Sequence, residues 1–177
     1  MLVGFALGLV AQNAGEWLAH KYILHGMARK KDSFWAFHWH EHHKESRRND
    51  FYDPHYQRSL FSGLHAQSKE ALGLAAAGLA VLPLAPVAPG FTAGFLVGIA
   101  NYYRVHKKSH NDPEWAKAHL PWHYDHHMGP NQHANWCVTF PLFDYVMGTR
   151  EPYLGTEREA KDRARRERRA AVSATAA

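Results

Sequence analysis

The stretch ALGLAAAGLAVLPLAPVAPGFTAGFLVGIANYY, Ala71–Tyr103, decides the fold of this 177-residue chain. It is apolar and carries no lysine or arginine, and Pro83, Pro86 and Pro89 cluster near its middle. Because prolines punctuate helices, a turn is expected there. The stretch is too long for one membrane span and short for two full ones. It therefore predicts a helical hairpin that runs to about residue 82 and returns from about residue 91.

The basic residues avoid the apolar parts of the chain. All 21 lysines and arginines lie within residues 21–69 and 104–169, and residues 1–20 and 70–103 contain none. Cytoplasmic loops of membrane proteins carry such an excess. We therefore interpret the net charge of +5 as membrane topology with both basic blocks cytoplasmic. No nucleic acid partner is expected, since no nucleic-acid-binding motif is present.

Residues 1–18 lack the basic start of a secretory signal and are interpreted as an uncleaved membrane helix, with a buried core helix as the alternative. The expected fold is all-α: an integral-membrane bundle with membrane segments at about 1–18, 71–85 and 90–105 and a cytoplasmic, histidine-rich helical cap. One domain is expected over residues 1–149. Residues 150–177 are expected to form a basic polar tail, either simply solvated or docking anionic lipid or an acidic redox partner.

Fifteen histidines are the extreme feature of the composition, and only one cysteine is present. Eleven of the histidines form two pairs and two clusters that follow the apolar segments, and with three ligands from the first cluster they offer ten imidazole nitrogens: HKYILH (residues 20–25), HWHEHH (38–43), HKKSH (106–110) and HYDHH (123–127). Residues three or four apart share one face of a helix, so these imidazoles can converge. Because a tetrahedral zinc needs only four ligands, ten nitrogens predict two ions of higher coordination. Imidazole alone does not select the metal.

This order of histidine motifs around a hairpin resembles the fatty acid hydroxylase / sterol desaturase superfamily of integral-membrane di-iron oxygenases. The run WHYDHHMGPNQHANWCVTFPLFDYVMGT (Trp122–Thr149) is the most specific match, and EWLAHKYILHG (Glu16–Gly26) resembles the bacterial carotenoid hydroxylases. The resemblance covers about residues 16–149. It implies that two histidine-held irons, replaceable by zinc in a purified sample, activate O2 and oxidise an unactivated C–H bond of a lipid by hydroxylation or desaturation.

The resemblance also implies the ligands. They are three histidines of the first cluster together with His20, His25, His106, His110, His123, His126 and His127. On an α-helix, His38, His42 and His43 span a narrower arc than His40, His42 and His43. We therefore expect His38, His42 and His43 as ligands and His40 as a bystander, which could replace His38 if the helix is broken. His55, His65, His119 and His133 are interpreted as structural.

Metal-bound imidazoles usually donate their second N–H to an acceptor. Glu16 and Asp125 are the expected acceptors. Asn131 and Asn135 match an Asn-rich turn of the family and are expected near the metals, with turn formation as the alternative. Aromatic residues crowd the histidine segments and are expected either to line an apolar channel or to lie at a membrane interface: Phe34, Trp35, Phe37, Trp39, Trp115, Trp122, Tyr124 and Trp136.

The chain departs from the family pattern in two places. Trp39 occupies the leading position of the usual first cluster, and one membrane helix precedes the first histidines where many members have two. A homodimer is one remedy for the missing helix. Since no haem, iron–sulfur or dinucleotide motif is present, a separate ferredoxin- or cytochrome-like electron donor is expected.

Three alternatives remain open at the level of the sequence. The first is a carotenoid ring hydroxylase, and the second is a histidine-rich metal-binding or metal-transport membrane protein without catalysis. Residues 71–103 contain little polar character, so an ion path through them is poorly supported. The third is a non-catalytic relative of the oxygenases, against which the near-complete set of histidines counts.

Overall fold

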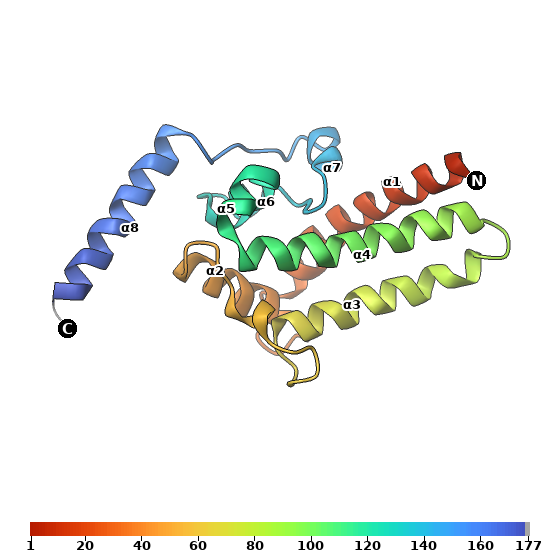
Figure 1. Ribbon diagram of the computed structural model, residues 1–177, viewed down its shortest axis with the longest axis horizontal. Helices are drawn as coiled ribbons and strands as arrows, with labels where there is room; N and C mark the ends of the chain where they lie inside the picture. Colours follow the sequence, from red (N-terminus) through yellow and green to blue (C-terminus); the bar gives the residue numbers. More distant parts are fainter. Residues whose placement is uncertain (176–177) are drawn as a thin grey trace.

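The computed structural model describes residues 1–175, and this part of the chain is built of helices without a strand (Figure 1). The all-α expectation is therefore confirmed. In chain order the helices are α1 (Leu2–Leu18), η1 (Ala19–Met27), η2 (His38–His43), α2 (Lys44–Arg48), η3 (Pro54–Gln57), α3 (Ala66–Val81), η4 (Leu82–Leu84), α4 (Pro89–Asn111), α5 (Pro113–His119), α6 (Pro121–Met128), α7 (Leu142–Val146) and α8 (Glu157–Thr175).

Helices α1, α3 and α4 form an arm that extends from the histidine-bearing helices, with the N-terminus near its tip (Figure 1). Glycines let α1 and α4 approach closely. A Cβ atom on Gly8 would lie 2.1 Å from the carbonyl oxygen of Phe91, and one on Gly94 would lie 2.1 Å from that of Phe5. Small residues at every fourth position pack membrane helices in this way. The sequence reasoning overlooked this spacing.

The hairpin lies at the stretch that decides the fold. Helix α3 ends at Val81, the short helix η4 makes the turn, and α4 starts at Pro89. Proline suits the first position of a helix because the N–H it lacks would have no partner there. The prolines thus set both ends of the turn.

Within the described residues, no helix combines the length and the apolar character that a bilayer crossing requires. The segments expected at about 1–18, 71–85 and 90–105 correspond to α1, α3 and the first part of α4. Helices α1 and α3 have 17 and 16 residues, against about 20 for a span. Helix α4 has 23 residues, but its last turns are basic and histidine-bearing. The structure does not support these three segments as membrane spans.

After α4 ends, the chain turns back toward the histidine-bearing end of that helix. Asp112 follows α4 and its side chain accepts a hydrogen bond from the backbone N–H of Trp115, which caps α5, and Pro113 is the first residue of that helix. Helix α6 then starts at Pro121. This path places the histidines of α6 next to those of α4.

Residues 150–177, expected as a polar tail, include a first part that packs against the rest of the molecule. Tyr153 is 3% exposed and packs with Phe51 and Tyr124, so the packed body continues past residue 149. From Glu157 the chain forms α8 (Figure 1), and Arg166 on this helix pairs with Asp50 at 3.3 Å. The last two residues of the tail, 176–177, lie outside the described residues.

Candidate metal centre

Nine buried imidazoles form two groups, and within each group the nitrogens on offer lie within 4.8 Å of one another. His123 stands beside the second group, with its Nε2 3.1 Å from Nε2 of His110. All ten histidines expected as ligands are thus gathered in one place. The first group is His20, His25, His38, His43 and His126, and the second is His42, His106, His110 and His127.

The two His-His doublets divide between the groups. His42 belongs to the second group and His43 to the first, and His126 and His127 divide in the same way. Adjacent residues on a helix point about 100° apart, so a doublet cannot aim both rings at one point. Each doublet instead holds the groups next to each other, and the rings of His43 and His127 stack with centroids 4.2 Å apart.

Helices η1 and η2 are π-helices, and this winding decides which histidines pair. His38 and His43 are five residues apart, which on an α-helix would separate them by about 140°. A π-helix closes its turns from residue i to residue i+5, so the two rings come to one face. Their Nε2 atoms lie 3.2 Å apart. The α-helical prediction selected the three histidines of the first cluster that lie in these groups, but it placed them on one arc, whereas the structure divides them between the two groups.

The other histidines lie outside both groups. His40 is half-buried, and its Nε2 lies 3.4 Å from the backbone oxygen of Arg29. His55 contacts Asp53, and His65 contacts the serines around it. His119 lies against the backbone of Trp115 and His133 against the side chain of Arg29. These placements agree with the structural interpretation of His55, His65, His119 and His133 and with the expectation that His40 is a bystander.

Most of the gathered imidazoles turn Nδ1 toward a protein oxygen and Nε2 inward. His42 Nδ1 lies 2.7 Å from Asp53 Oδ2, His106 Nδ1 lies 2.8 Å from Glu70 Oε1, and His43 Nδ1 lies 3.0 Å from Gln132 Oε1. Backbone carbonyls serve the others: Trp136 for His20, Ala134 for His126 and Phe51 for His110. Such acceptors fix the tautomer and orientation of a metal ligand.

Phe51 carries backbone strain at this site. Its φ is 82°, in the left-handed region that bulky residues rarely adopt. This conformation costs about 1–3 kcal/mol and persists only where the surroundings impose it. Here the carbonyl oxygen of Phe51 lies 2.9 Å from His110 Nδ1, and the Phe51 ring stacks on the His110 ring at 4.5 Å. The strained conformation of Phe51 thus brings both its carbonyl oxygen and its ring into contact with His110.

The residues expected as imidazole acceptors have other partners. The carboxylate of Glu16 accepts hydrogen bonds from the backbone N–H groups of Val138 and Thr139 and from the Thr139 hydroxyl. It therefore joins α1 to the segment that follows the Asn-rich turn. Glu16 does line the cavity described below, but it makes no hydrogen bond to an imidazole in the part of the chain described.

Asp125 and the two asparagines bind the segment after residue 149. Asp125 pairs with Arg150 at 2.8 Å and accepts from the backbone N–H of Leu154. Asn135 adopts φ 58°, which asparagine tolerates, and accepts from the backbone N–H of Glu151. Asn131 donates to the side chain of Glu151. These contacts favour turn formation over a place beside the metals.

Asp53, Glu70 and Gln132 are the acceptors that the sequence reasoning missed. Asp53 is fully buried and also accepts from His55 Nδ1, at 2.8 Å. Glu70 is 7% exposed and also accepts from the hydroxyl of Tyr56. A carboxylate next to an apolar stretch needs a buried partner, and Glu70 directly precedes Ala71. That position was the available signal for Glu70.

The chemistry of the donors fits bound cations. Burial lowers the pKa of His126 to about 3. Burial, reinforced by the neighbouring imidazoles, also holds the pKa of eight others well below the usual range: His20, His25, His38, His42, His43, His110, His123 and His127. Neutral imidazoles offer the lone pairs that a metal binds.

Several of these lone pairs have no hydrogen-bond partner among the described residues. Nε2 of His42, Nε2 of His106 and both ring nitrogens of His127 are buried without a hydrogen bond. Nε2 of His43 lies 3.2 Å from Nε2 of His126, and both rings turn Nδ1 to an oxygen, so two acceptors face each other. Imidazoles bound to one ion at about 2.1 Å lie about 3 Å apart, so a cation resolves the conflict.

The comparison with protein families agrees with this geometry. The model of the family described as fatty acid hydroxylase matches residues 5–149, most of the chain. The chain belongs to the fatty acid hydroxylase family. This family is part of the fatty acid hydroxylase / sterol desaturase superfamily, so the resemblance noted in the sequence is confirmed. No match was found among the curated proteins or among the solved structures. Membership implies an oxidoreductase, and the histidine groups provide it with a place for metal ions.

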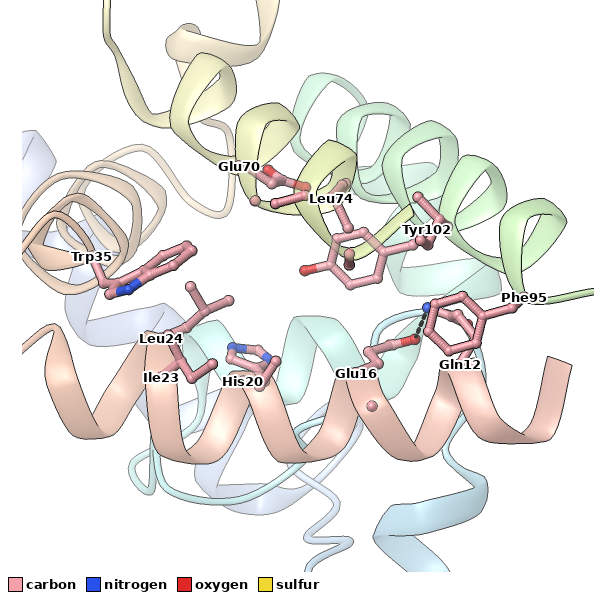
Figure 2. A pocket seen from close by; sticks show the side chains of 16 residues that line it. Gln12, Glu16, His20, Ile23, Leu24, Trp35, Glu70, Leu74, Phe95 and Tyr102 are labelled. Atoms are coloured by element: carbon pink, nitrogen blue, oxygen red, sulfur yellow. Dashed lines mark hydrogen bonds between the residues drawn. The ribbon is translucent and has the colours of Figure 1, made fainter. Parts of the chain in front are cut away.

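A cavity of about 340 Å³ adjoins the metal centre of this fatty acid hydroxylase family member. It lies between α1 and η1 on one side and α3 and α4 on the other, and Figure 2 shows Glu16 and His20 facing Glu70 and Leu74. Small residues leave the space open: Gly15, Ala19, Gly73, Ala76 and Ala77. Of the aromatic residues expected to line a channel, Trp35 does so here.

Proposed function

We propose that this chain is an O2-dependent hydroxylase, or a desaturase, that oxidises an unactivated C–H bond of a membrane lipid such as a fatty acyl chain or a sterol-like molecule. One observation carries the proposal. The apolar cavity reaches His20, a member of the first histidine group, and Glu70, which accepts a hydrogen bond from His106 of the second. An apolar molecule in this cavity touches the first group at His20 and comes near the second at Glu70, the hydrogen-bond partner of His106.

Two iron ions, one in each histidine group, would supply the activation of O2 and the oxidation of the C–H bond. The residues of the chain would hold the metal ions and orient the lipid. Asp53 and Glu70 keep Nδ1 of His42 and His106 protonated, which leaves Nε2 of each ring free for the metal. The small residues of the cavity admit the lipid, and Trp35 and Leu74 help to exclude water from the reacting carbon.

The reaction needs electrons from outside the chain. Inserting one oxygen atom of O2 into a C–H bond consumes two electrons and two protons and releases the other oxygen atom as water. No haem, iron–sulfur or dinucleotide motif occurs in the sequence, so a separate donor protein supplies the electrons.

The arm of α1, α3 and α4 contacts the apolar layer of a membrane in this proposal, and the histidine-bearing helices face the cytoplasm. Large apolar side chains along the arm support this: Leu2 is 86% exposed, Leu79 66% and Val87 81%. Exposed apolar patches of this kind mark protein or membrane contacts. The close glycine packing of α1 against α4 is also the kind found between membrane helices.

The experiment is an oxidation assay with purified, iron-loaded protein in mild detergent. The protein is supplied with a reductant and ¹⁸O2 and offered a fatty acyl lipid, a sterol and β-carotene in separate reactions. The proposal expects about two irons per chain and one ¹⁸O atom in a lipid product, or a desaturated lipid. A hydroxylated carotenoid with unchanged lipids would favour the carotenoid ring hydroxylase. Iron binding without any O2-dependent product would contradict the enzymatic proposal.

Narrowing the cavity tests whether it holds the substrate. Ala77 lines the cavity, whereas Ala75 lies on the same helix outside the lining and is exposed. We expect Ala77→Leu to lower product formation by at least tenfold while iron content stays the same, and Ala75→Leu to change neither. Equal activity of the Ala77→Leu variant and the original chain would show that the substrate lies elsewhere.

A further inference from the structure

A pair of stacked rings reaches from the first histidine group to the surface. Trp39 and His133 stack with centroids 5.6 Å apart and planes 6° apart. His133 is exposed and Trp39 is half-buried. The centroid of the His25 ring lies 5.2 Å from that of Trp39 and 5.5 Å from that of His133, and the His43 ring lies 5.5 Å from Trp39. The pair is therefore in contact with two imidazoles of the first group.

The second histidine group has no comparable access on its aromatic side. Among the described residues, the aromatic rings packed there are Phe51, Tyr56 and Tyr102, and they are 0%, 1% and 5% exposed. Electron tunnelling weakens steeply with distance, so a donor protein reaches the centre best where the cover is thinnest. Trp39 and His133 form the cover over the first group.

The surface beside this pair is basic. Arg29 Nη2 lies 2.6 Å from His133 Nε2, so the guanidinium group sits directly against the stacked rings. Lys30 and Lys31 follow Arg29, and all three residues are exposed. Asp32, also exposed, is the only acidic residue among residues 26–40. Complementary charge steers association between proteins and makes its rate sensitive to salt.

We propose that the surface formed by Trp39, His133 and Arg29–Lys31 is the docking site of an acidic protein that donates one electron at a time. The inference rests on the proposed function, which creates the need for electrons. In each encounter the reduced donor loses one electron, which passes by way of the stacked pair to His25 and His43, and an iron held by these residues would be the acceptor. Two encounters supply the two electrons that one O2 requires.

The probe is a reduced, acidic plant-type [2Fe–2S] ferredoxin. Stopped-flow absorbance gives the rate at which it reduces the iron-loaded protein, and surface plasmon resonance gives its binding to the zinc-loaded protein, which no redox step affects. We expect Arg29→Glu to lower both by at least tenfold, and added salt to do the same to the original chain. We expect Trp39→Leu to slow reduction by at least tenfold with binding unchanged.

Arg158→Glu is the matched control, because Arg158 is an exposed arginine on α8, and we expect it to change neither quantity. The docking site is wrong if Arg29→Glu leaves ferredoxin binding intact, or if Arg158→Glu weakens it. A loss of binding to anionic phospholipid vesicles in Arg29→Glu with normal ferredoxin binding would also overturn it, in favour of a lipid contact. Reduction by methyl viologen radical, which needs no docking site, tests the iron centre separately. Its failure would contradict the proposed function, while binding to the zinc-loaded protein would still test the docking surface.

Discussion

Acid should unfold the metal-free protein within a narrow range near neutral pH. Nine of the gathered histidines have pKa values lowered by burial, so they stay neutral in the folded chain. In the unfolded chain each of them takes up a proton below its ordinary pKa of about 6.5. Because the unfolded state then binds more protons than the folded state, stability falls as the pH falls through that value.

The expected loss of stability is large because the contributions of the nine histidines add. Between pH 7 and pH 6, one histidine that remains neutral in the folded state costs roughly half to one kcal/mol, and nine together cost about 6 kcal/mol. This is comparable to the whole free energy of unfolding of an ordinary domain, about 5–15 kcal/mol. Metal-free protein that is folded at pH 7 should therefore be largely unfolded near pH 6. Bound metal competes with protons for the same nitrogens, so the loaded protein should stay folded to lower pH.

The assay is urea unfolding in a mild detergent, followed by tryptophan fluorescence, at several pH values with and without metal. The control is the metal-loaded protein under the same conditions, which should show a smaller loss between pH 7 and pH 6. A free energy of unfolding for the metal-free protein that changes by less than about 1 kcal/mol over this range would refute the reasoning. It would mean that the histidines are open to water and protons in the folded chain.

Three sets of substitutions test other parts of the structure. His38→Ala should lower the metal content by about one ion per chain, whereas His40→Ala should leave it unchanged in the same elemental analysis; the reverse result would exchange their roles. Glu70→Ala should weaken metal binding by about 10- to 100-fold in a chelator competition, because His106 loses its acceptor; unchanged affinity would refute that role. Gly8→Ala should lower the free energy of unfolding by about 2 kcal/mol or more, since its Cβ would meet backbone. Gly15→Ala on the same helix, with open space around it, should not lower it.

The sequence identified the histidines that gather because imidazole is rare and its spacing is readable. Ten histidines were expected to converge, and the structure brings all ten together. The hairpin could be predicted for a similar reason, since clustered prolines break helices wherever they occur. The structure does not support the predicted membrane spans. The prediction considered the apolar character of whole segments, whereas the helices that form there are shorter or end in basic turns.

The pairing within the centre could not be predicted with α-helical arithmetic. That arithmetic placed His38 beside His42, but the π-helix η2 turns His38 toward His43 and leaves His42 to the other group. The spacing contained a clue, since His20 and His25 are also five residues apart and also lie in a π-helix. Two pairs with this spacing in one chain indicate π-helical winding, because residues five positions apart lie on one face only when the helix has the wider π turn.

The acceptors behind the imidazoles were the hardest part to predict, and the reason is chemical. Carbonyls of Trp136, Ala134 and Phe51 accept from three of the rings, and a backbone carbonyl occurs at every position of the chain. Side-chain acceptors are also common, so proximity in sequence favoured Glu16 and Asp125 over Asp53 and Glu70, which are distant from some of the histidines that they serve. Such partners are chosen by the folded path of the chain. A prediction of ligands can therefore come from residue types alone, but a prediction of what orients them needs the fold first.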